Sequence, residues 1–334
     1  MMPRIKYHAA LAVVAWLLLF GLFSSASLAQ EKSKDNDKPQ PTGTPVLWKD
    51  PGDISSRDLL IGPGGEEMKP DLNNLTFLKE DATGFSYGMR VRDSAGREWV
   101  VKLGKESQPE TAASRLLWAV GYMTEIHYLF PCVKVNGAPA TPAKNVPRCE
   151  GQGFANARFE ARPEGIKRLN EWMWANNPFV GTKELKGLIV MMALINNWDL
   201  KDANNKVIYV PSSITGGQDE LQYILSDLGA TFGKTGSFLS RSRNAPKDYA
   251  KAKFVTGVQG NLVKLNYGGK NKGLMDNITV EDAKWIGGLL AKLSDKQIED
   301  AFRAGNFSAE EVQMLAGAVR QRISQLNSLT FGGR

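Results

Sequence analysis

The chain has 334 residues, with 42 lysine and arginine and 35 aspartate and glutamate side chains, which gives a formal net charge of +7 at pH 7. This length is sufficient for one large domain or two lobes. The charge is too mild to indicate nucleic-acid binding, for which no motif is present either. The two histidines, one of them within the first 29 residues, exclude a metal site built from several histidine ligands.

The N-terminus has the pattern of a secretory signal peptide. Arg4 and Lys6 precede an apolar run over 9–23 that is short for a membrane-spanning helix. We therefore expect a signal peptide over 1–29 that is removed rather than kept as an anchor. The polar, proline-containing stretch over 30–45 then predicts a disordered linker. The expected protein is exported, periplasmic or secreted, and has no transmembrane helix after signal removal.

The chain has two cysteines, Cys132 and Cys149, which lie 17 positions apart. In an exported protein a disulfide bond between them is favoured, and two free thiols are the alternative. Pro131 and Pro147 lie close to them, so the bridge is expected to close an irregular loop.

Residues 84–88, Gly-Phe-Ser-Tyr-Gly, match the G-x-S-x-G pattern of a hydrolase nucleophile elbow, which needs a helix after the serine and a histidine downstream. Residues 89–93 and 98–103 have instead the pattern of two strands joined by a turn over 94–97. His127 is the sole histidine left after signal removal and lies among bulky apolar residues. A packed structural role is therefore favoured for this histidine.

The same segment suits a loop that covers phosphate groups. Gly84 and Gly88 permit a close approach of the backbone, and Ser86 between them is small. Lys102 ends the apolar strand that follows, where its ammonium group could pair with phosphate oxygens. A solvated lysine at a sheet edge is the alternative.

A helix is predicted over 109–121, with Ser107 at the cap, Pro109 at the first position and Glu110 in the first turn. Glu110 has two interpretations that do not exclude each other. It could complete a capping box with Ser107, or its carboxylate could orient Lys102.

The stretch Asn-Asn-Trp-Asp-Leu-Lys-Asp-Ala-Asn places Asp199, Lys201 and Asn204 in the spacing D-x-K-x-x-N. It follows an apolar run predicted to end a buried helix, and a predicted strand over 221–225 leads to Asp227 in Ser-Asp-Leu-Gly. This order suits phosphoryl transfer, which uses a carboxylate near the acceptor hydroxyl, a lysine on the phosphoryl group, and an asparagine and a second aspartate on Mg²⁺.

With these motifs the chain resembles the protein-kinase-like fold, and its spacings are most similar to the phosphoinositide 3- and 4-kinase type. In that family a strand lysine is followed by x-G, as in the Lys-Leu-Gly that Lys102 begins. The catalytic-loop aspartate precedes a metal-binding asparagine by five positions, as Asp199 precedes Asn204. The D-F-G motif with a further glycine is similar to the Asp-Leu-Gly at Asp227 with Gly233. Bacterial toxin kinases and secreted Golgi-type kinases share this core.

The resemblance implies an α+β, bilobal kinase-like fold, with a strand-rich N-lobe over 46–160 and a mainly helical C-lobe over 161–334. Lys102 and Asp227 are expected to face one cleft between the lobes. The resemblance also implies that ATP, or another nucleoside triphosphate, and Mg²⁺ are bound. The implied site consists of the nucleotide-binding residues Gly84, Ser86, Gly88, Lys102 and Glu110, the metal-binding residues Asn204 and Asp227, and the catalytic residues Asp199 and Lys201.

Some positions depart from the family pattern. Asn197 and Trp198 stand where protein kinases have His-Arg, while Lys201 matches the protein-kinase loop rather than the D-R-H of lipid kinases. The two metal-binding motifs are far apart in the sequence, which predicts a hairpin or insertion over 211–220. These departures leave the substrate class open.

A basic segment over 233–272 follows the metal motif, at the position where kinase-like folds carry the activation or substrate loop. It suggests an anionic acceptor, either a lipid head group or an acidic protein, and a solvated mobile loop is the alternative. Four aromatic residues in it also suit a membrane surface, namely Phe238, Tyr249, Phe254 and Tyr267. One acid, Asp248, accompanies nine basic residues: Lys234, Arg241, Arg243, Lys247, Lys251, Lys253, Lys264, Lys270 and Lys272.

The C-terminal part is predicted to be helical, because three successive segments begin with a capping pattern. The pairs are Thr279 with Asp282, Ser294 with Gln297, and Ser308 with Glu311.

Taken together, the motifs predict an exported, Mg²⁺-dependent kinase-like phosphotransferase that moves a nucleotide phosphoryl group to a hydroxyl of a lipid head group or protein. The alternative is a pseudokinase or nucleotide-binding interaction module without catalysis.

Overall fold

The computed structural model describes residues 40–81, 86–140 and 146–332. The expected signal peptide over 1–29, the linker over 30–39 and the expected phosphate-loop residue Gly84 lie outside the described residues. Residues Thr42–Arg334 form one compact unit. Within the described ranges, no helix has both the length and the apolar character needed to cross a membrane.

The first layer of this unit is an antiparallel sheet with the strand order β2-β3-β4-β6-β5. Alternating apolar residues on its inner face form one core, in which Met89, Val91, Val101 and Phe159 are fully buried. The two strands and the turn expected over 89–103 are confirmed. The strands are β2 (Thr76–Asp81), β3 (Tyr87–Arg92), β4 (Glu98–Leu103), β5 (His127–Val133) and β6 (Phe154–Ala161).

Helix α2 (Ser107–Ala119) connects β4 to β5 and packs on β5 and β6. It begins two residues before the predicted start, and Glu106 occupies the cap position without a side-chain capping bond in the described structure. Ser107 lies inside the first turn, and its hydroxyl donates to the backbone oxygen of Lys102 at 3.1 Å. The predicted capping box between Ser107 and Glu110 is therefore wrong.

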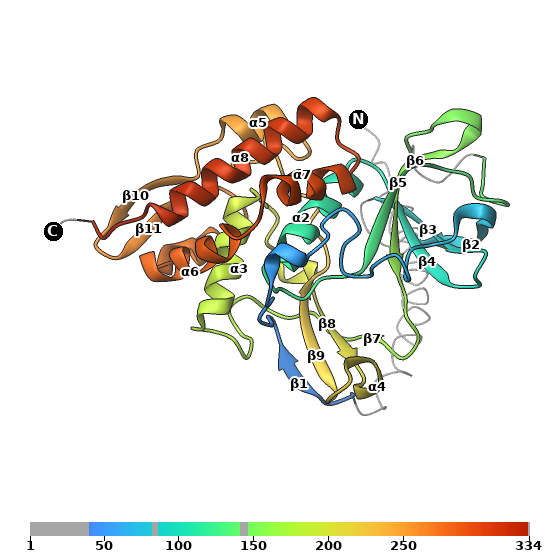
Figure 1. The fold of residues 1–334 in the computed structure, drawn as a ribbon, viewed down its shortest axis with the longest axis horizontal. Coiled ribbons are helices and arrows are strands. Elements are labelled where there is room, and N and C mark those ends of the chain that lie inside the picture. Colours follow the sequence, from blue (N-terminus) through green and yellow to red (C-terminus); the bar gives the residue numbers. More distant parts are fainter. Residues whose placement is uncertain (1–39, 82–85, 141–145, 333–334) are drawn as a thin grey trace, which may run out of the picture. The chain divides into compact units, whose positions relative to one another are not determined.

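A second, smaller sheet lies below α2 in Figure 1, with the strand order β1-β9-β8-β7. The hairpin expected over 211–220 is confirmed as the connection between β8 and β9, which contains the short helix α4 (Ser212–Thr215). Thr44 and Pro45, at the end of the expected disordered linker, pair with β9 instead. The strands are β1 (Thr44–Val46), β7 (Lys167–Arg168), β8 (Asn205–Val210) and β9 (Glu220–Leu225).

The remaining part is mainly helical and lies on the other side of α2 from the large sheet (Figure 1). Helices α6, α7 and α8 each begin with the expected capping box, with both hydrogen bonds present, so these predictions are confirmed. The helices are α3 (Lys183–Leu194), α5 (Pro246–Lys251), α6 (Val280–Leu290), α7 (Asp295–Ala304) and α8 (Ala309–Asn327), with a hairpin of β10 (Val255–Gln259) and β11 (Leu262–Leu265). Short 3-10 helices are η1 (Ile54–Ser56), η2 (Leu72–Asn74), η3 (Glu150–Gln152), η4 (Asp202–Asn204) and η5 (Lys272–Asn277).

The second core joins α2 to the helical part. Ala112 and Leu116 of α2 pack in the same buried cluster as α3, α6, α7 and α8. Leu47 and Ile54, which were expected in the strand-rich lobe, belong to this cluster too. The chain thus has an α+β architecture with a strand-rich sheet region and a helical C-terminal part, consistent with the expected bilobal kinase-like fold.

Two predictions about single residues are settled by the fold. Cys132, at the end of β5, forms a disulfide bond with Cys149, and their Cα atoms are 5.8 Å apart. His127 is buried, and Nε2 lies 2.8 Å from the Ser114 hydroxyl while Nδ1 lies 3.5 Å from an Arg158 nitrogen. Burial, helped by Arg158 and Arg115, holds the pKa of His127 well below its ordinary value, so it is a neutral structural residue.

Candidate functional site

Lys102 lies on β4 between two neighbouring strands, opposite Gly88 of β3 and Arg158 of β6. Its ammonium nitrogen is 3.7 Å from Asp81 Oδ2. A Cβ atom added at Gly88 would lie 3.2 Å from the same nitrogen. The described glycine of the expected phosphate loop and the expected phosphate-binding lysine are therefore neighbours, and glycine leaves room for the lysine head group.

The first turn of α2 places Glu110 in a buried ion pair. Its carboxylate lies 3.0 Å from a guanidinium nitrogen of Arg158, which also reaches Glu160 at 3.6 Å. Burial raises the pKa of Glu110 to about 8, since it outweighs the attraction of Arg158, and the negative charge of Asp227 adds to the rise. The carboxyl group of Glu110 was expected to orient Lys102. It is held instead by Arg158, which lies opposite Lys102 on the neighbouring strand β6.

The polar loop after α3 is organised around Asp199. Its carboxylate forms ion pairs with two lysines, Lys201 at 3.0 Å and Lys270 at 3.0 Å. Burial alone would raise the pKa of this carboxyl, but the two lysines lower it below the ordinary value, so Asp199 is ionised at neutral pH. The amide of Asn204 donates to the backbone oxygen of Asp199 at 2.6 Å, which fixes the asparagine beside the aspartate.

The hairpin β8–β9 brings the two predicted metal-binding motifs together. Its register pairs Asn205 with Leu225, so the residues just outside the pair lie at the same end of the hairpin. The Ser226 N–H donates to the backbone oxygen of Asn204 at 2.8 Å. The length of chain between the motifs is therefore irrelevant to their separation in space.

Further bonds join the Asp-Leu-Gly turn to the Asp199 loop. The Trp198 N–H donates to the Ala230 oxygen at 3.3 Å, and the Asn196 amide donates to the Gly233 oxygen at 2.8 Å. Within the turn, the Gly229 N–H donates to Asp227 Oδ1 at 3.1 Å. The two motifs behave as one structural unit, because each fixes the backbone of the other.

Asp227 lies near enough to the large sheet to act on its charges. Its negative charge acts on the ionisation of Glu110 and of Arg158. Since Arg158 is the strand neighbour of Lys102, this supports the expectation that Lys102 and Asp227 face one cleft, which stays a prediction.

The residues present fit a hard cation. Among the described residues no group of three or more His, Cys, Asp or Glu side chains is placed to hold a metal by itself. The amide nitrogen of Asn204 donates to Asp199, so the side-chain oxygen of Asn204 can bind a metal. One carboxylate oxygen of Asp227 accepts a hydrogen bond within the turn, and the other can bind the same metal. Two such oxygens suit Mg²⁺, which binds few protein ligands and completes its shell with water and phosphate oxygens.

Glu106 contacts the candidate site, although the sequence motifs did not point to it. It accepts a hydrogen bond from the Ser86 hydroxyl at 2.6 Å and forms an ion pair with Arg243. A Cβ atom at Gly229 would lie 2.5 Å from its Cβ atom, so this glycine is needed for close packing. Glu106 connects the expected phosphate loop, the metal motif and the basic segment, which are far apart in sequence and give no local signal.

The basic segment is not a mobile loop throughout. It contains α5 and the β10–β11 hairpin, and Tyr249 and Phe254 are buried in the helical core rather than exposed toward a membrane. At its tip, Phe238 and Leu239 are 78% and 93% exposed. Arg241 lies between them and the site, with its guanidinium carbon 4.0 Å from the ring centre of Trp198.

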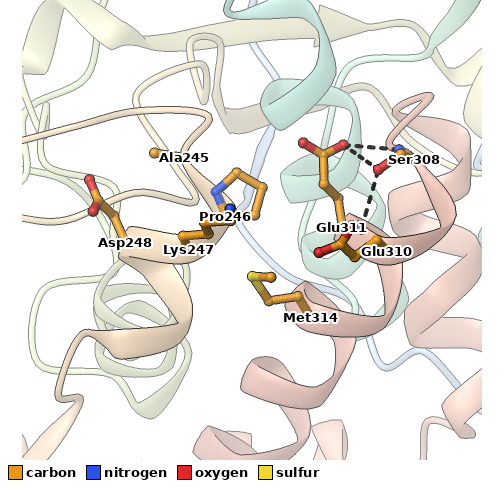
Figure 2. Close-up of a pocket in the computed structure, with 8 residues that line it drawn as sticks. All are labelled: Ala245, Pro246, Lys247, Asp248, Ser308, Glu310, Glu311 and Met314. Carbon is orange, nitrogen blue, oxygen red and sulfur yellow. Dashed lines mark hydrogen bonds between the residues drawn. The ribbon is translucent and has the colours of Figure 1, made fainter.

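A cavity of about 450 Å³ lies between the start of α5 and the start of α8 (Figure 2). The Glu311 carboxylate in its wall accepts hydrogen bonds from the Ser308 N–H and the Ser308 hydroxyl, both at 3.0 Å. No predicted site residue among those the structure describes lines this cavity. Its lining is Ala245, Pro246, Lys247, Asp248, Ser308, Glu310, Glu311 and Met314.

No protein-family model matches the chain, and no curated protein matches it. Among solved structures, the chain is similar to the proinflammatory kinase CtkA of Helicobacter pylori, with a TM-score of 0.44 and 10% sequence identity. The similarity covers 78% of this chain and 97% of that kinase.

Proposed function

We propose that the chain is an exported, Mg²⁺-dependent kinase-like phosphotransferase. It would move a phosphoryl group from ATP, or another nucleoside triphosphate, to a hydroxyl of a lipid head group or protein. The observation that carries the proposal is the joining of the Asn204 and Asp227 motifs by the β8–β9 hairpin, with Asp199 bonded to the same unit. The oxygen atoms of Asn204 and Asp227 that would bind the metal, and the ionised carboxylate of Asp199, therefore lie on one hydrogen-bonded unit.

Each residue has a role that its surroundings favour. Lys102 would hold phosphate oxygens of the nucleotide, and Asn204 with Asp227 would hold Mg²⁺, which neutralises phosphate charge when bound. Asp199 would orient the acceptor hydroxyl and take its proton. Lys201, 3.0 Å from Asp199, would steady the phosphoryl group during transfer.

In the transfer itself, a bond forms between the acceptor oxygen and phosphorus while the bond from phosphorus to the leaving diphosphate breaks. The diphosphate departs with the bonding electrons, and the hydroxyl proton passes to the Asp199 carboxylate. Most of the rate gain in such a reaction comes from positioning and from charge neutralisation.

The exposed tip of the basic segment supports a lipid acceptor over a protein acceptor. Phe238 and Leu239 present apolar side chains to solvent directly before Arg241 and Arg243. Apolar residues beside cations are what an anionic membrane surface attracts.

One observation favours the second candidate function, a pseudokinase that binds a nucleotide without transferring phosphate. In active protein kinases the strand lysine pairs with a helix glutamate. Here the carboxylate of Glu110 pairs with Arg158 at 3.0 Å, while Lys102 lies 3.7 Å from Asp81. Both candidate functions use the same nucleotide-binding residues. A measurement of nucleotide turnover therefore distinguishes the phosphotransferase from the pseudokinase.

The first test is a thermal shift measured with Asp227→Asn. The amide keeps an oxygen but loses the charge that a hard cation needs, so the Mg²⁺-dependent part of the nucleotide-induced rise in Tm should disappear. A ligand present at 100 times its Kd stabilises by about 2.7 kcal/mol, and each kcal/mol raises Tm by about 2–4 °C in a chain of this size. A wild-type shift of several degrees is therefore expected.

The control is Asp276→Asn, which removes an exposed carboxylate outside the site and should keep the full shift. If Asp227→Asn keeps it as well, Asp227 is only a turn residue and the metal assignment is wrong. If the wild-type protein shows no shift with any nucleoside triphosphate and Mg²⁺, the proposed function is contradicted. A shift without turnover would select the pseudokinase.

A further inference from the structure

The segment that follows β11 is built to lie against the Asp199 loop. The Lys270 N–H donates to the Trp198 oxygen at 2.9 Å, and the Asn271 amide donates to the Leu200 oxygen at 2.7 Å. A Cβ atom at Gly269 would lie 2.6 Å from the same Trp198 oxygen, so this approach requires glycine. Two hydrogen bonds and one obligatory glycine thus fix this segment on either side of Asp199.

The segment delivers the ammonium group of Lys270 to Asp199. Lys270 Nζ lies 3.0 Å from Oδ1, and Lys201 Nζ lies 3.0 Å from Oδ2, so each carboxylate oxygen faces one lysine. The Tyr267 hydroxyl donates to the Lys270 oxygen at 3.1 Å and holds the backbone on the other side. The two lysines come from loops that lie about seventy residues apart in the sequence.

Stability does not account for this placement. The side chains of Lys270 and Lys201 are 45% and 44% exposed. An ion pair of such exposure contributes at most about 1 kcal/mol to folding, because water screens the attraction and the side chains lose freedom. A half-exposed ammonium remains accessible to an anionic ligand, whereas a purely structural lysine needs no such access.

We infer that Lys270 is a second phosphate-binding residue of this site, which acts with Lys201 on the phosphoryl group that approaches Asp199. The inference rests on the proposed function. A phosphoryl group in transfer spreads its charge over three oxygens, and cations that converge on it lower the barrier through electrostatic stabilisation. Lys201 and Lys270 approach Asp199 from two directions and can therefore hold two of these oxygens, while Asp199 faces the acceptor hydroxyl.

The test compares Lys270→Ala with wild type in nucleotide turnover. Removal of one preorganised donor to the reacting group should lower kcat by about 10²-fold, while the Mg²⁺–nucleotide shift in Tm persists because Lys102, Asn204 and Asp227 remain. Lys270→Arg keeps the charge and should restore part of the rate. Lys292→Ala removes an exposed lysine outside the basic segment and should leave the rate unchanged.

The Tm measured without ligand separates this role from a structural one. Loss of a half-exposed ion pair should change that Tm little, whereas kcat should fall. An unchanged kcat in Lys270→Ala would reduce Lys270 to a surface ion pair and overturn the inference. A higher kcat in Lys270→Ala would also overturn it, since the lysine would then obstruct Asp199.

A readout without catalysis keeps the inference separate from the proposed function. Inorganic pyrophosphate should raise the Tm of the wild-type protein, and Lys270→Ala should lose a large part of that rise while Lys292→Ala keeps it. If wild type turns over no nucleotide but this difference persists, the phosphotransferase proposal is contradicted and the phosphate-binding role stands. If Lys270→Ala keeps the full pyrophosphate-induced rise, the inference is overturned whatever the turnover.

Discussion

At the scale of single residues, the candidate site depends on charges whose partners come from distant strands. Glu110 is the clearest case, because Arg158 lies 3.0 Å away while Glu160 and Asp227 contribute negative charge nearby. Burial of this group outweighs its ion pair and raises its pKa to about 8. Near neutral pH the folded protein therefore holds a proton on Glu110 that the unfolded chain does not.

This proton predicts a pH dependence that Glu110→Gln removes. Between the ordinary pKa of 4.5 and the raised value of about 8, the folded state binds more protons than the unfolded state, so the free energy of unfolding falls as pH rises. One proton corresponds to a slope of at most about 1.4 kcal/mol per pH unit. The glutamine variant cannot titrate and should lose this part of the slope.

The measurement is chemical denaturation of both proteins from pH 4.5 to 8.5. Glu125 also has a pKa raised to about 8 and is present in both proteins, so most of its contribution cancels in the difference between them. Glu98→Gln, an exposed change on β4, should follow the wild-type curve. Parallel curves for wild type and Glu110→Gln would contradict the raised pKa.

At the scale of elements, two short-range constraints support the site from outside. The β8–β9 hairpin sets the distance between Asn204 and Asp227, as its register places them at one end. The Cys132–Cys149 disulfide ties the end of β5 to the connection that leads into β6, which carries Arg158. Arg158, the neighbour of Lys102, therefore lies on a strand that follows a loop closed by the disulfide bond.

The disulfide predicts a loss of stability in the double variant Cys132→Ser, Cys149→Ser. Closing a loop of this length lowers the entropy of the unfolded chain by an amount worth about 3 kcal/mol. Tm should therefore fall by roughly 6–12 °C at about 2–4 °C per kcal/mol. Wild-type protein treated with a reductant should have the same Tm as the double variant. The Tm of the double variant should not change when the reductant is added. A wild-type Tm that is insensitive to complete reduction would contradict the prediction.

At the scale of the whole molecule, the basic segment consists of two parts. One part is structural, since Tyr249 and Phe254 fill the helical core and α5 packs on α8. The other part is exposed, with Phe238 and Leu239 at the tip and the Trp198-stacked Arg241 behind them. The exposed part lies next to the Asp199 loop, because Arg241 stacks on Trp198 and Trp198 directly precedes Asp199.

This arrangement predicts binding to anionic vesicles. Wild type should sediment with phosphatidylglycerol-containing vesicles and not with pure phosphatidylcholine, and added salt should weaken binding, since each basic residue near the surface contributes about 1 kcal/mol. Phe238→Ser with Leu239→Ser should lower the bound fraction several-fold. Ile214→Ser, at a residue that is 50% exposed on another element, is the matched control. Absence of binding to either vesicle would favour an acidic protein as the acceptor.

The sequence by itself determined the features that depend on neighbouring residues. Capping boxes at Thr279, Ser294 and Ser308, the strand pair over 89–103 and the β8–β9 hairpin each follow from contacts within a few residues, and all are confirmed. The disulfide was expected because the chain has two cysteines and an N-terminal pattern typical of exported proteins. The site motifs were also local, because catalytic loops place their groups at fixed spacings.

Only the tertiary structure decided which distant groups meet. The pairing of Glu110 with Arg158, the contacts of Glu106 with Ser86 and Arg243, and the approach of Lys270 to Asp199 join segments that no spacing connects. The burial of aromatic residues that were expected on a surface belongs to the same class. The reason is physical: a charged or aromatic side chain has many possible partners in an extended chain, and close packing of the folded chain selects one of them.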